Sequence, residues 1–451
     1  MGGTGLSEVV DRLLEYALQE APKIQRPLGR CQGYVDIARA FLESGKKSRS
    51  MECLQAALQA AGPLKPEEKS RQLAGIAVVY AAAGDRVQAA DLFKRAVLLA
   101  QATETPAQQS GALLQIASEY AAAGMSDDAE AVLSKLHNLV TNPESGVDTA
   151  CELVDIASIY ADIGQMDKSG EMAEEAVQVS RKLEDNWIRA ERFLAAAQVY
   201  SDIDNIGKAR QVLEEALHAV DRIDPVGKPY FLIRMADVWT DLEDQPRAEE
   251  ILSTALGIVD EEEEAFPRSG DLIEIARRLA GLGKNSHAGE VLDRAQASAE
   301  EIEDNKDKIA RFIEIAGLRD ELGASEEALE QADRAFHLCS RLTDNRTLLH
   351  MLGNLALLYS GLKKKEKADE AVSWIRKIVQ ETNVRTAGLG TPAEDLAAAG
   401  DFIQSLRLSA LIHEPEIKVY ILARVSQSLI ESGKEPGEEL LQVVREAISA
   451  A

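Results

Sequence analysis

The stretch LLQIASEYAAAGMSDDAEAVL, Leu113–Leu133, places an apolar residue, an alanine, an aromatic residue and a glycine in a fixed order. Forty residues further on, LVDIASIYADIGQMDKSGEMA, Leu153–Ala173, gives the same order again. A constant period of this length is typical of a protein built from one repeated supersecondary unit. The two stretches therefore indicate a repeat fold, and the rest of the chain can be aligned on them.

The pair formed by an apolar residue and an alanine recurs nine times, with 39 or 40 residues between successive alanines. We call this alanine the repeat alanine. The nine repeat alanines are Ala38, Ala77, Ala117, Ala157, Ala197, Ala236, Ala276, Ala316 and Ala356.

Each unit reads as two helices. Leu73, Ile76 and Tyr80 lie around Ala77 at three- and four-residue spacing, which predicts one apolar helix stripe. Gly84 follows, where a helix can end with a positive φ. A second run at the same spacing comprises Ala89, Ala90, Phe93, Ala96 and Val97. The unit is therefore predicted to be a helical hairpin.

Helix-breaking segments separate the units. Proline-containing junctions such as GPLKPEEK and ATETPAQ alternate with Asp-Asn pairs such as Asp185-Asn186, and both favour turns and helix starts. Ser126 and Ser325 precede acidic helix starts and are expected to be N-caps, and Pro246 is expected in the first turn of a second helix.

This combined pattern resembles the tetratricopeptide repeat. The residues that match position by position in the second unit are Ile76, Ala77, Tyr80, Gly84, Ala89, Phe93 and Ala96. The resemblance covers about Arg30 to Lys377 and implies an all-α, right-handed α-solenoid, or superhelix, of helical hairpins. Units of the family are typically about 34 residues long, so units of 39 or 40 residues imply the longer-repeat variant.

The two ends of the chain depart from the period. We expect residues 1–29 to be an N-terminal capping helix over the first unit. Residues 30–377 are expected to hold nine repeats, and residues 378–451 degenerate repeats and a C-terminal cap. Terminal repeats of solenoids are usually atypical because one of their faces meets water.

The composition and the motifs disfavour several kinds of partner and of functional site. The net charge of −26 disfavours nucleic acid and membrane surfaces as partners. Four scattered cysteines give no zinc spacing, and with no signal peptide evident they indicate a cytoplasmic protein with reduced thiols. ESGKKS and GLGTPA imitate phosphate-binding loops without the strand that such loops require. The sequence therefore predicts no catalytic residues, no metal site and no cofactor.

The inner surface of such a solenoid is formed by the first helices of the hairpins, and the resemblance implies that partners bind there. The positions one, four and five residues after the repeat alanine are expected to face it. Small residues fill these positions in the early units. Acidic residues appear from the fourth unit onward, namely Asp162, Asp202, Asp237, Asp241, Asp320 and Glu321.

The sequence therefore predicts a non-enzymatic scaffold whose acidic inner residues bind a basic protein or peptide segment. A solvated acidic face is the competing interpretation of the same residues. Two other functions stay open: a structural subunit that assembles with itself into a homo-oligomer, and a regulatory module that senses a small ligand.

Overall fold

The computed structural model describes residues 5–142, 146–382 and 384–449. These residues form 23 α-helices and three short 3-10 segments, and the described part of the chain contains no strand. The predicted all-α helical repeat solenoid is confirmed. The chain divides into two compact units, which we describe separately. Unit 1 comprises Met1–Glu68, Gly75–Ala89 and Ile302–Ala451, and unit 2 comprises Lys69–Ala74 and Ala90–Glu301.

The repeats follow one another as helix, tight turn, helix. We call the first and second helix of each hairpin its A and B helix. The A helices are α2 (Pro27–Glu43), α4 (Pro66–Ala82), α6 (Pro106–Ala122), α8 (Thr149–Asp162), α10 (Asn186–Asp202), α12 (Lys228–Asp241), α14 (Ala265–Gly281), α16 (Asn305–Glu321) and α18 (Asn345–Gly361). The B helices are α3 (Lys47–Ala60), α5 (Arg86–Gln101), α7 (Ser126–Val140), α9 (Met166–Ser180), α11 (Ile206–Val220), α13 (Gln245–Val259), α15 (Asn285–Glu301), α17 (Ser325–Cys339) and α19 (Lys365–Glu381).

All nine repeat alanines are buried, with at most 1% of their surface exposed. In unit 2, α6, α8, α10, α12 and α14 form a row in which each A helix packs on the next. A methyl side chain lets two helix backbones approach closely, and interiors are packed tightly enough for an added methylene to be felt. Burial at one position in every repeat confirms the alignment made from the sequence.

The seventh residue after each repeat alanine has a positive φ, which reverses the chain between the two helices. Six of the nine are glycines, at positions 45, 84, 124, 164, 283 and 323, as the glycine signal predicts. The other three are Asp204, Glu243 and Lys363, with φ of 57° to 59°. The left-handed turn is thus imposed by the hairpin packing even where the residue disfavours it.

The residues that cap the helix starts agree with the sequence-based expectation in some helices and differ from it in others. Asp185, Asp304 and Asp344 are N-caps that accept backbone N–H bonds, and Pro246 lies in the first turn of α13, as predicted. The expectation for Ser126 and Ser325 is wrong. Each is the first residue inside its helix, and the N-cap residues before them make no side-chain cap bond. The helix simply begins one residue earlier than the Ser signal indicates.

A recurring polar cluster ties successive repeats together. The Tyr200 hydroxyl donates to Glu174 of the preceding B helix at 3.2 Å, and Lys208 donates to the same carboxylate at 2.6 Å. In unit 1, Tyr359 donates to Asp333 at 2.9 Å, and Lys367 pairs with Asp333. In both clusters the carboxylate precedes the lysine by 34 residues. We call this the tyrosine–carboxylate–lysine cluster.

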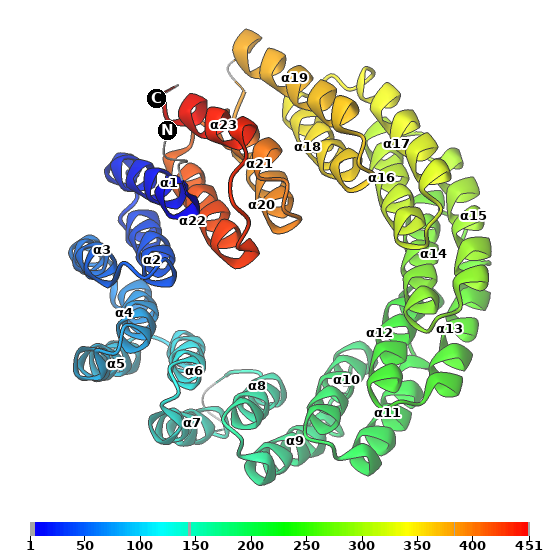
Figure 1. The fold of residues 1–451 in the computed structure, drawn as a ribbon. Coiled ribbons are helices and arrows are strands. Elements are labelled where there is room, and N and C mark those ends of the chain that lie inside the picture. Colours follow the sequence, from blue (N-terminus) through cyan, green and yellow to red (C-terminus); the bar gives the residue numbers. More distant parts are fainter. Residues whose placement is uncertain (1–4, 143–145, 383, 450–451) are drawn as a thin grey trace. The chain divides into compact units, whose positions relative to one another are not determined.

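In unit 1 the row of A helices includes both ends of the chain. It runs α16, α18, α20 (Gly390–Ala398), α22 (Pro415–Ser432) and then α2 (Figure 1). A Cβ added at Gly33 of α2 would lie 3.1 Å from Val419 of α22, so glycine permits this approach. The side chain of Gln427 donates to Glu43 at 3.0 Å. The first and last A helices are therefore neighbours.

The B helix that pairs with α22 is α1 (Leu6–Glu20), from the opposite end of the chain. Val9, Val10, Leu13 and Leu14 are buried on it. Glu435, just after α22, accepts the Leu6 N–H at 3.2 Å. The predicted terminal helix thus has a main partner that the sequence period did not indicate.

The register of α1 is that of a B helix. Arg49 of α3 donates to Glu15 of α1 at 2.9 Å, and the two are 34 residues apart, as in the tyrosine–carboxylate–lysine cluster. The Arg49 guanidinium also lies 5.6 Å from the centre of the Phe41 ring, which takes the place of the tyrosine. Hence α1 precedes the first repeat in the same way as any B helix precedes the next hairpin, and α22 is its A helix.

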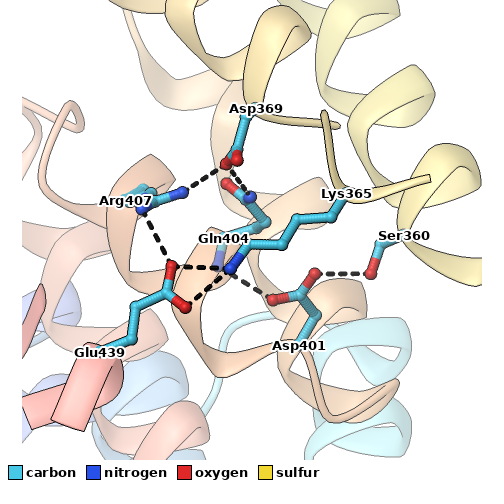
Figure 2. A network of polar contacts seen from close by, with 7 residues as sticks. All are labelled: Ser360, Lys365, Asp369, Asp401, Gln404, Arg407 and Glu439. Carbon is cyan, nitrogen blue, oxygen red and sulfur yellow. Dashed lines mark hydrogen bonds and ion pairs between the residues drawn. The ribbon is translucent and has the colours of Figure 1, made fainter. Parts of the chain in front are cut away.

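Charged residues hold the last described helices to their neighbours. Lys365 donates to both carboxylate oxygens of Glu439 on α23 (Glu438–Ser449), at 2.7 and 2.9 Å. Arg407 of α21 (Phe402–Ser409) pairs with both Glu439 and Asp369 (Figure 2). Gln404 donates to Asp369 at 2.6 Å. Since α23 packs on α21 and α1, these ion pairs fix it where a further B helix would lie.

Candidate functional site

Three carboxylates occupy one repeat-equivalent position at the C-terminal ends of successive A helices in unit 2. Asp162 on α8, Asp202 on α10 and Asp241 on α12 all lie five residues after a repeat alanine, and all three are exposed. Since α8 packs on α10 and α10 on α12, the three carboxylates follow one another along the row. We call them the acidic row.

One amide links two members of the acidic row. The Gln198 Nε2 group donates to Asp202 at 2.9 Å and to Asp241 at 3.1 Å, across the boundary between α10 and α12. An amide carries no charge, so the two carboxylates are held near each other without neutralisation. Two like charges repel each other more strongly near a protein surface than in bulk water. A cation that binds beside Asp202 and Asp241 would reduce this repulsion, so the pair favours a positively charged partner.

Asp237 belongs to a different arrangement. Arg278 of α14 donates to both of its oxygens, from Nε at 3.1 Å and from Nη2 at 3.3 Å. Arg278 also pairs with Glu274 on its own helix. Asp237 is therefore already paired with a cation inside the protein and is less able than the acidic row to bind another.

The remaining two predicted site residues are in unit 1. Asp320 accepts a hydrogen bond from the Ser325 hydroxyl at 2.7 Å, across the turn between α16 and α17. Glu321 is exposed at the end of α16. The structure thus brings Asp162, Asp202 and Asp241 into one row of A helices and places Asp320 and Glu321 in the other unit.

Another carboxylate of α8, that of Asp155, is half-buried. Burial and then the charge of Glu152 raise the pKa of Asp155 above its usual value, although Arg192 acts in the opposite direction. A raised carboxyl pKa means that the ionised form is disfavoured by its surroundings.

Three of the four thiols, those of Cys31, Cys53 and Cys339, are buried. Burial raises the pKa of Cys31, Cys53 and Cys339 to about 12, so these thiols stay protonated and are poor nucleophiles. Among the described residues, no group of three His, Cys, Asp or Glu side chains could hold a metal ion. None of the described helices has the length and apolarity needed to cross a bilayer.

Two open cavities lie between successive B helices in unit 2. One of about 550 Å³ is bounded by Glu174, Tyr200 and Lys208. The other, of about 560 Å³, is bounded by Glu214, Trp239 and Arg247, which are the equivalent residues one repeat later. Both cavities are thus repeat-to-repeat grooves around the tyrosine–carboxylate–lysine position.

Sequence reasoning missed an exposed apolar set at the opposite ends of the A helices. Trp187, Val226 and Phe266 lie ten residues before successive repeat alanines and are 41%, 68% and 42% exposed. Tyr230 of α12 is 45% exposed beside them. We call these four residues the apolar ledge. The signal was available in the sequence, because the repeat register predicts which side chains at the helix starts face water.

The repeating hairpin of small-residue A helices and glycine turns resembles the tetratricopeptide repeat in its helix order and turn position. No family model and no curated protein matches the chain. Solved structures similar to it include Ton1535 from Thermococcus onnurineus NA1, with 19% identity, 79% of this chain and 89% of that chain covered, and a TM-score of 0.30.

A Rap protein complexed with Competence and Sporulation Factor is also similar. It has 15% identity, covers 82% of this chain and 98% of its own, and has a TM-score of 0.31. A signal transduction ATPase with a tetratricopeptide repeat sensor from Pyrococcus horikoshii has 15% identity and a TM-score of 0.32, with 84% of this chain and 66% of that chain covered. These likenesses concern the fold alone.

Proposed function

We propose that this chain is a non-enzymatic interaction scaffold that binds a basic protein or peptide segment along the acidic row of unit 2. The observation that carries the proposal is the arrangement of Asp202 and Asp241 around Gln198, which leaves two exposed carboxylates near each other without a counter-charge. One carboxylate per repeat suits a segment that places one Lys or Arg against each hairpin. The cytoplasm is the compartment we expect, because the cysteines are reduced thiols.

Asp320 and Glu321 are proposed as a separate acidic contact in unit 1. Asp237 is proposed to help position the partner only through Arg278, since that guanidinium already binds both of its oxygens. Binding should therefore depend most on Asp202 and Asp241, and least on Asp237.

The test is a binding titration with a labelled Lys- and Arg-rich peptide over a salt series. Asp202→Asn with Asp241→Asn removes two charges from the acidic row. Asp127→Asn with Asp128→Asn removes two exposed charges from the start of α7 and is the matched control. We expect about a tenfold loss of affinity and a shallower salt dependence for the first double variant only. Equal affinities for the two double variants, or an affinity indifferent to salt, would refute the proposal.

Self-assembly is an alternative function, and the structure argues against self-assembly by end-to-end stacking. End-to-end stacking needs an uncovered terminal hairpin face, whereas α22 packs on both α1 and α2 within unit 1. Light scattering at several concentrations tests self-association by any other surface. The ligand-sensing alternative would use a cavity such as the one beside Tyr200, and a thermal-shift screen of small molecules tests it.

A further inference from the structure

The apolar ledge repeats with the hairpins, which separates it from scattered surface residues. Trp187, Val226 and Phe266 occupy the same position in three successive repeats. Trp187 and Phe266 lie in the first turns of α10 and α14, and Val226 lies in the 3-10 segment Pro225–Gly227 just before α12. The first and fourth repeats have Leu28 and Val147 there, both only partly exposed. The second, third, eighth and ninth repeats have Glu67, Ala107, Lys306 and Arg346. Single exposed apolar residues are ordinary, but a contiguous set of them marks an interaction surface.

The aromatic rings of the apolar ledge are held in place by their neighbours. Trp187 and Tyr230 lie nearly parallel, with ring centres 5.8 Å apart and an angle of 8° between their planes. The buried Phe231 ring meets Trp187 edge-on at 4.8 Å. A Cβ at Gly227 would lie 2.4 Å from the Trp187 ring, so glycine is required for the indole to lie there.

Arg234 completes this arrangement. Its guanidinium lies 5.2 Å from the centre of the Tyr230 ring and donates to the Tyr230 hydroxyl at 2.8 Å. Rings fixed before binding lose little conformational entropy when a partner docks, and aromatic side chains are enriched at interface centres for this reason among others. The apolar ledge is therefore preorganised.

An acidic residue accompanies each repeat of the apolar ledge. Asp185, Asp224 and Glu264 each precede the apolar residue by two positions, and all three are exposed. Asp185 and Asp224 use one oxygen to accept a backbone N–H, from Ile188 at 3.0 Å and from Val226 at 3.2 Å. The glutamate run Glu261–Glu264 extends the negative charge beside Phe266. The acidic side chains beside the apolar ledge are thus complementary in charge to Lys and Arg side chains of a partner.

We propose that the apolar ledge docks a protein segment in which apolar side chains alternate with Lys or Arg. Helices that pack on each other are about 8–10 Å apart, so three repeats present their apolar residues over about 20 Å. An extended segment rises about 3.3 Å per residue, so its apolar anchors would recur about every three residues, with basic residues between them facing Asp185, Asp224 and Glu264.

This surface is additional to the proposed function. On α10, Trp187 and Asp202 are 15 residues apart, which is about 22 Å along a helix. On α10 and α12, the two helices that carry residues of both sets, the apolar ledge and the acidic row therefore lie at opposite ends. Variants in one leave the other unaltered, so failure of either proposal can be recognised separately.

The experiment selects binding sequences from a displayed library of random peptides about 12 residues long, a length that exceeds the 20 Å span. The bait is the full chain, and the selected peptides are then titrated against variants. Trp187→Ser with Val226→Asp and Phe266→Ser removes three of the four residues of the apolar ledge. Val226→Asp alone is the second variant, because Val226 is 68% exposed and the ring contacts of Trp187 are to Tyr230 and Phe231. Val87→Ser with Leu98→Ser, at 84% and 66% exposure, is the control.

We expect the selected peptides to contain aromatic or aliphatic residues flanked by Lys or Arg. They should bind the control like the unaltered chain and the triple variant about tenfold or more weakly. Asp185→Asn with Asp224→Asn retains N-capping, since Asn caps as well as Asp. This pair should weaken binding at low salt and have no effect at high salt.

Four results would overturn the proposal. The selected peptides could lack basic residues, or could bind both ledge variants as tightly as the unaltered chain. The triple variant could abolish a concentration-dependent dimer seen by light scattering, which would make a second copy the occupant. The chain could float with phosphatidylcholine vesicles in a manner that the triple variant removes, which would make the surface a lipid contact.

Discussion

The hairpin of α10 and α11 is continuous in sequence, whereas the hairpin of α22 and α1 joins segments about 400 residues apart. Both place an A helix against a B helix, and in both the B helix carries a carboxylate that pairs with an arginine of the following B helix. Glu214 of α11 pairs with Arg247, 33 residues further along the chain, and Glu15 of α1 pairs with Arg49, 34 residues further along. The difference teaches that the repeat is defined by which faces pack, and not by connectivity. The apolar stripe of an A helix is buried only when a B helix packs on it. For α22, near the end of the chain, that B helix is α1, near its start.

The largest expected effect compares equivalent leucines in the two hairpins. Leu14 of α1 and Leu213 of α11 both precede the pairing carboxylate by one residue, and both are fully buried. Leu14→Ala and Leu213→Ala should each lose about 2–5 kcal/mol of unfolding free energy through lost burial and a residual cavity. Chemical denaturation of both variants measures this. A loss below 1 kcal/mol for Leu14→Ala alone would mean that the end-to-end hairpin is looser than a continuous one.

The next effect concerns the close approach of A helices. Ala117→Leu adds volume at a fully buried repeat alanine and should cost about 1–3 kcal/mol through overpacking. Ala122→Leu, at an exposed position of the same helix, is the control and should change stability little. Thermal unfolding compares them. Equal melting temperatures for the two variants would argue against the stacking of A helices at the repeat alanine.

A smaller effect tests the tyrosine–carboxylate–lysine cluster. Tyr200→Phe removes the hydroxyl that donates to Glu174 at 3.2 Å and should lose about 1 kcal/mol. Combining it with Glu174→Gln in a double-mutant cycle isolates the pairwise energy. Strict additivity of the two single variants would show that the hydroxyl and the carboxylate contribute independently.

The smallest effect compares turns with and without glycine. Glu243 has φ 57° where most repeats have glycine, so Glu243→Gly should gain up to about 1 kcal/mol by relieving the left-handed conformation. Gly283→Ala makes the opposite change at φ 74°, with no atom within 4 Å of the new Cβ, and should lose about the same amount. Denaturation midpoints that move in the same direction for both variants would contradict this account of the turn.

The sequence was sufficient to predict the helical hairpin and the register of its helices, because both depend on residues that are close together in the chain. Ala117 and Gly124 mark a buried position and a turn in a single unit, and period alone extends them to the other units. The pairing of α1 with α22 was not predictable in this way, since no residue of 5–24 indicates a partner so far away in the chain.

The candidate site was only partly predictable. Counting from the repeat alanine identifies Asp162, Asp202 and Asp241 as equivalent positions, and all three are exposed; that they bind a partner stays a prediction. It could not indicate that Asp237 pairs with Arg278, because the register predicts which way a side chain faces and not what it meets on the next helix. Trp187 and Phe266 were overlooked because an aromatic residue near a helix start was taken as part of a junction.

Hydrogen exchange of α1 tests the central claim, that the last hairpin is built from both ends of the chain. The comparison is between the full chain and a chain ending at residue 413, which lacks α22 and α23. We predict that the amides of Leu13 and Leu14 exchange slowly in the full chain and lose most of their protection in the shortened one, while those of Leu213 in α11 stay protected in both. Undiminished protection of α1 without α22 would contradict the account.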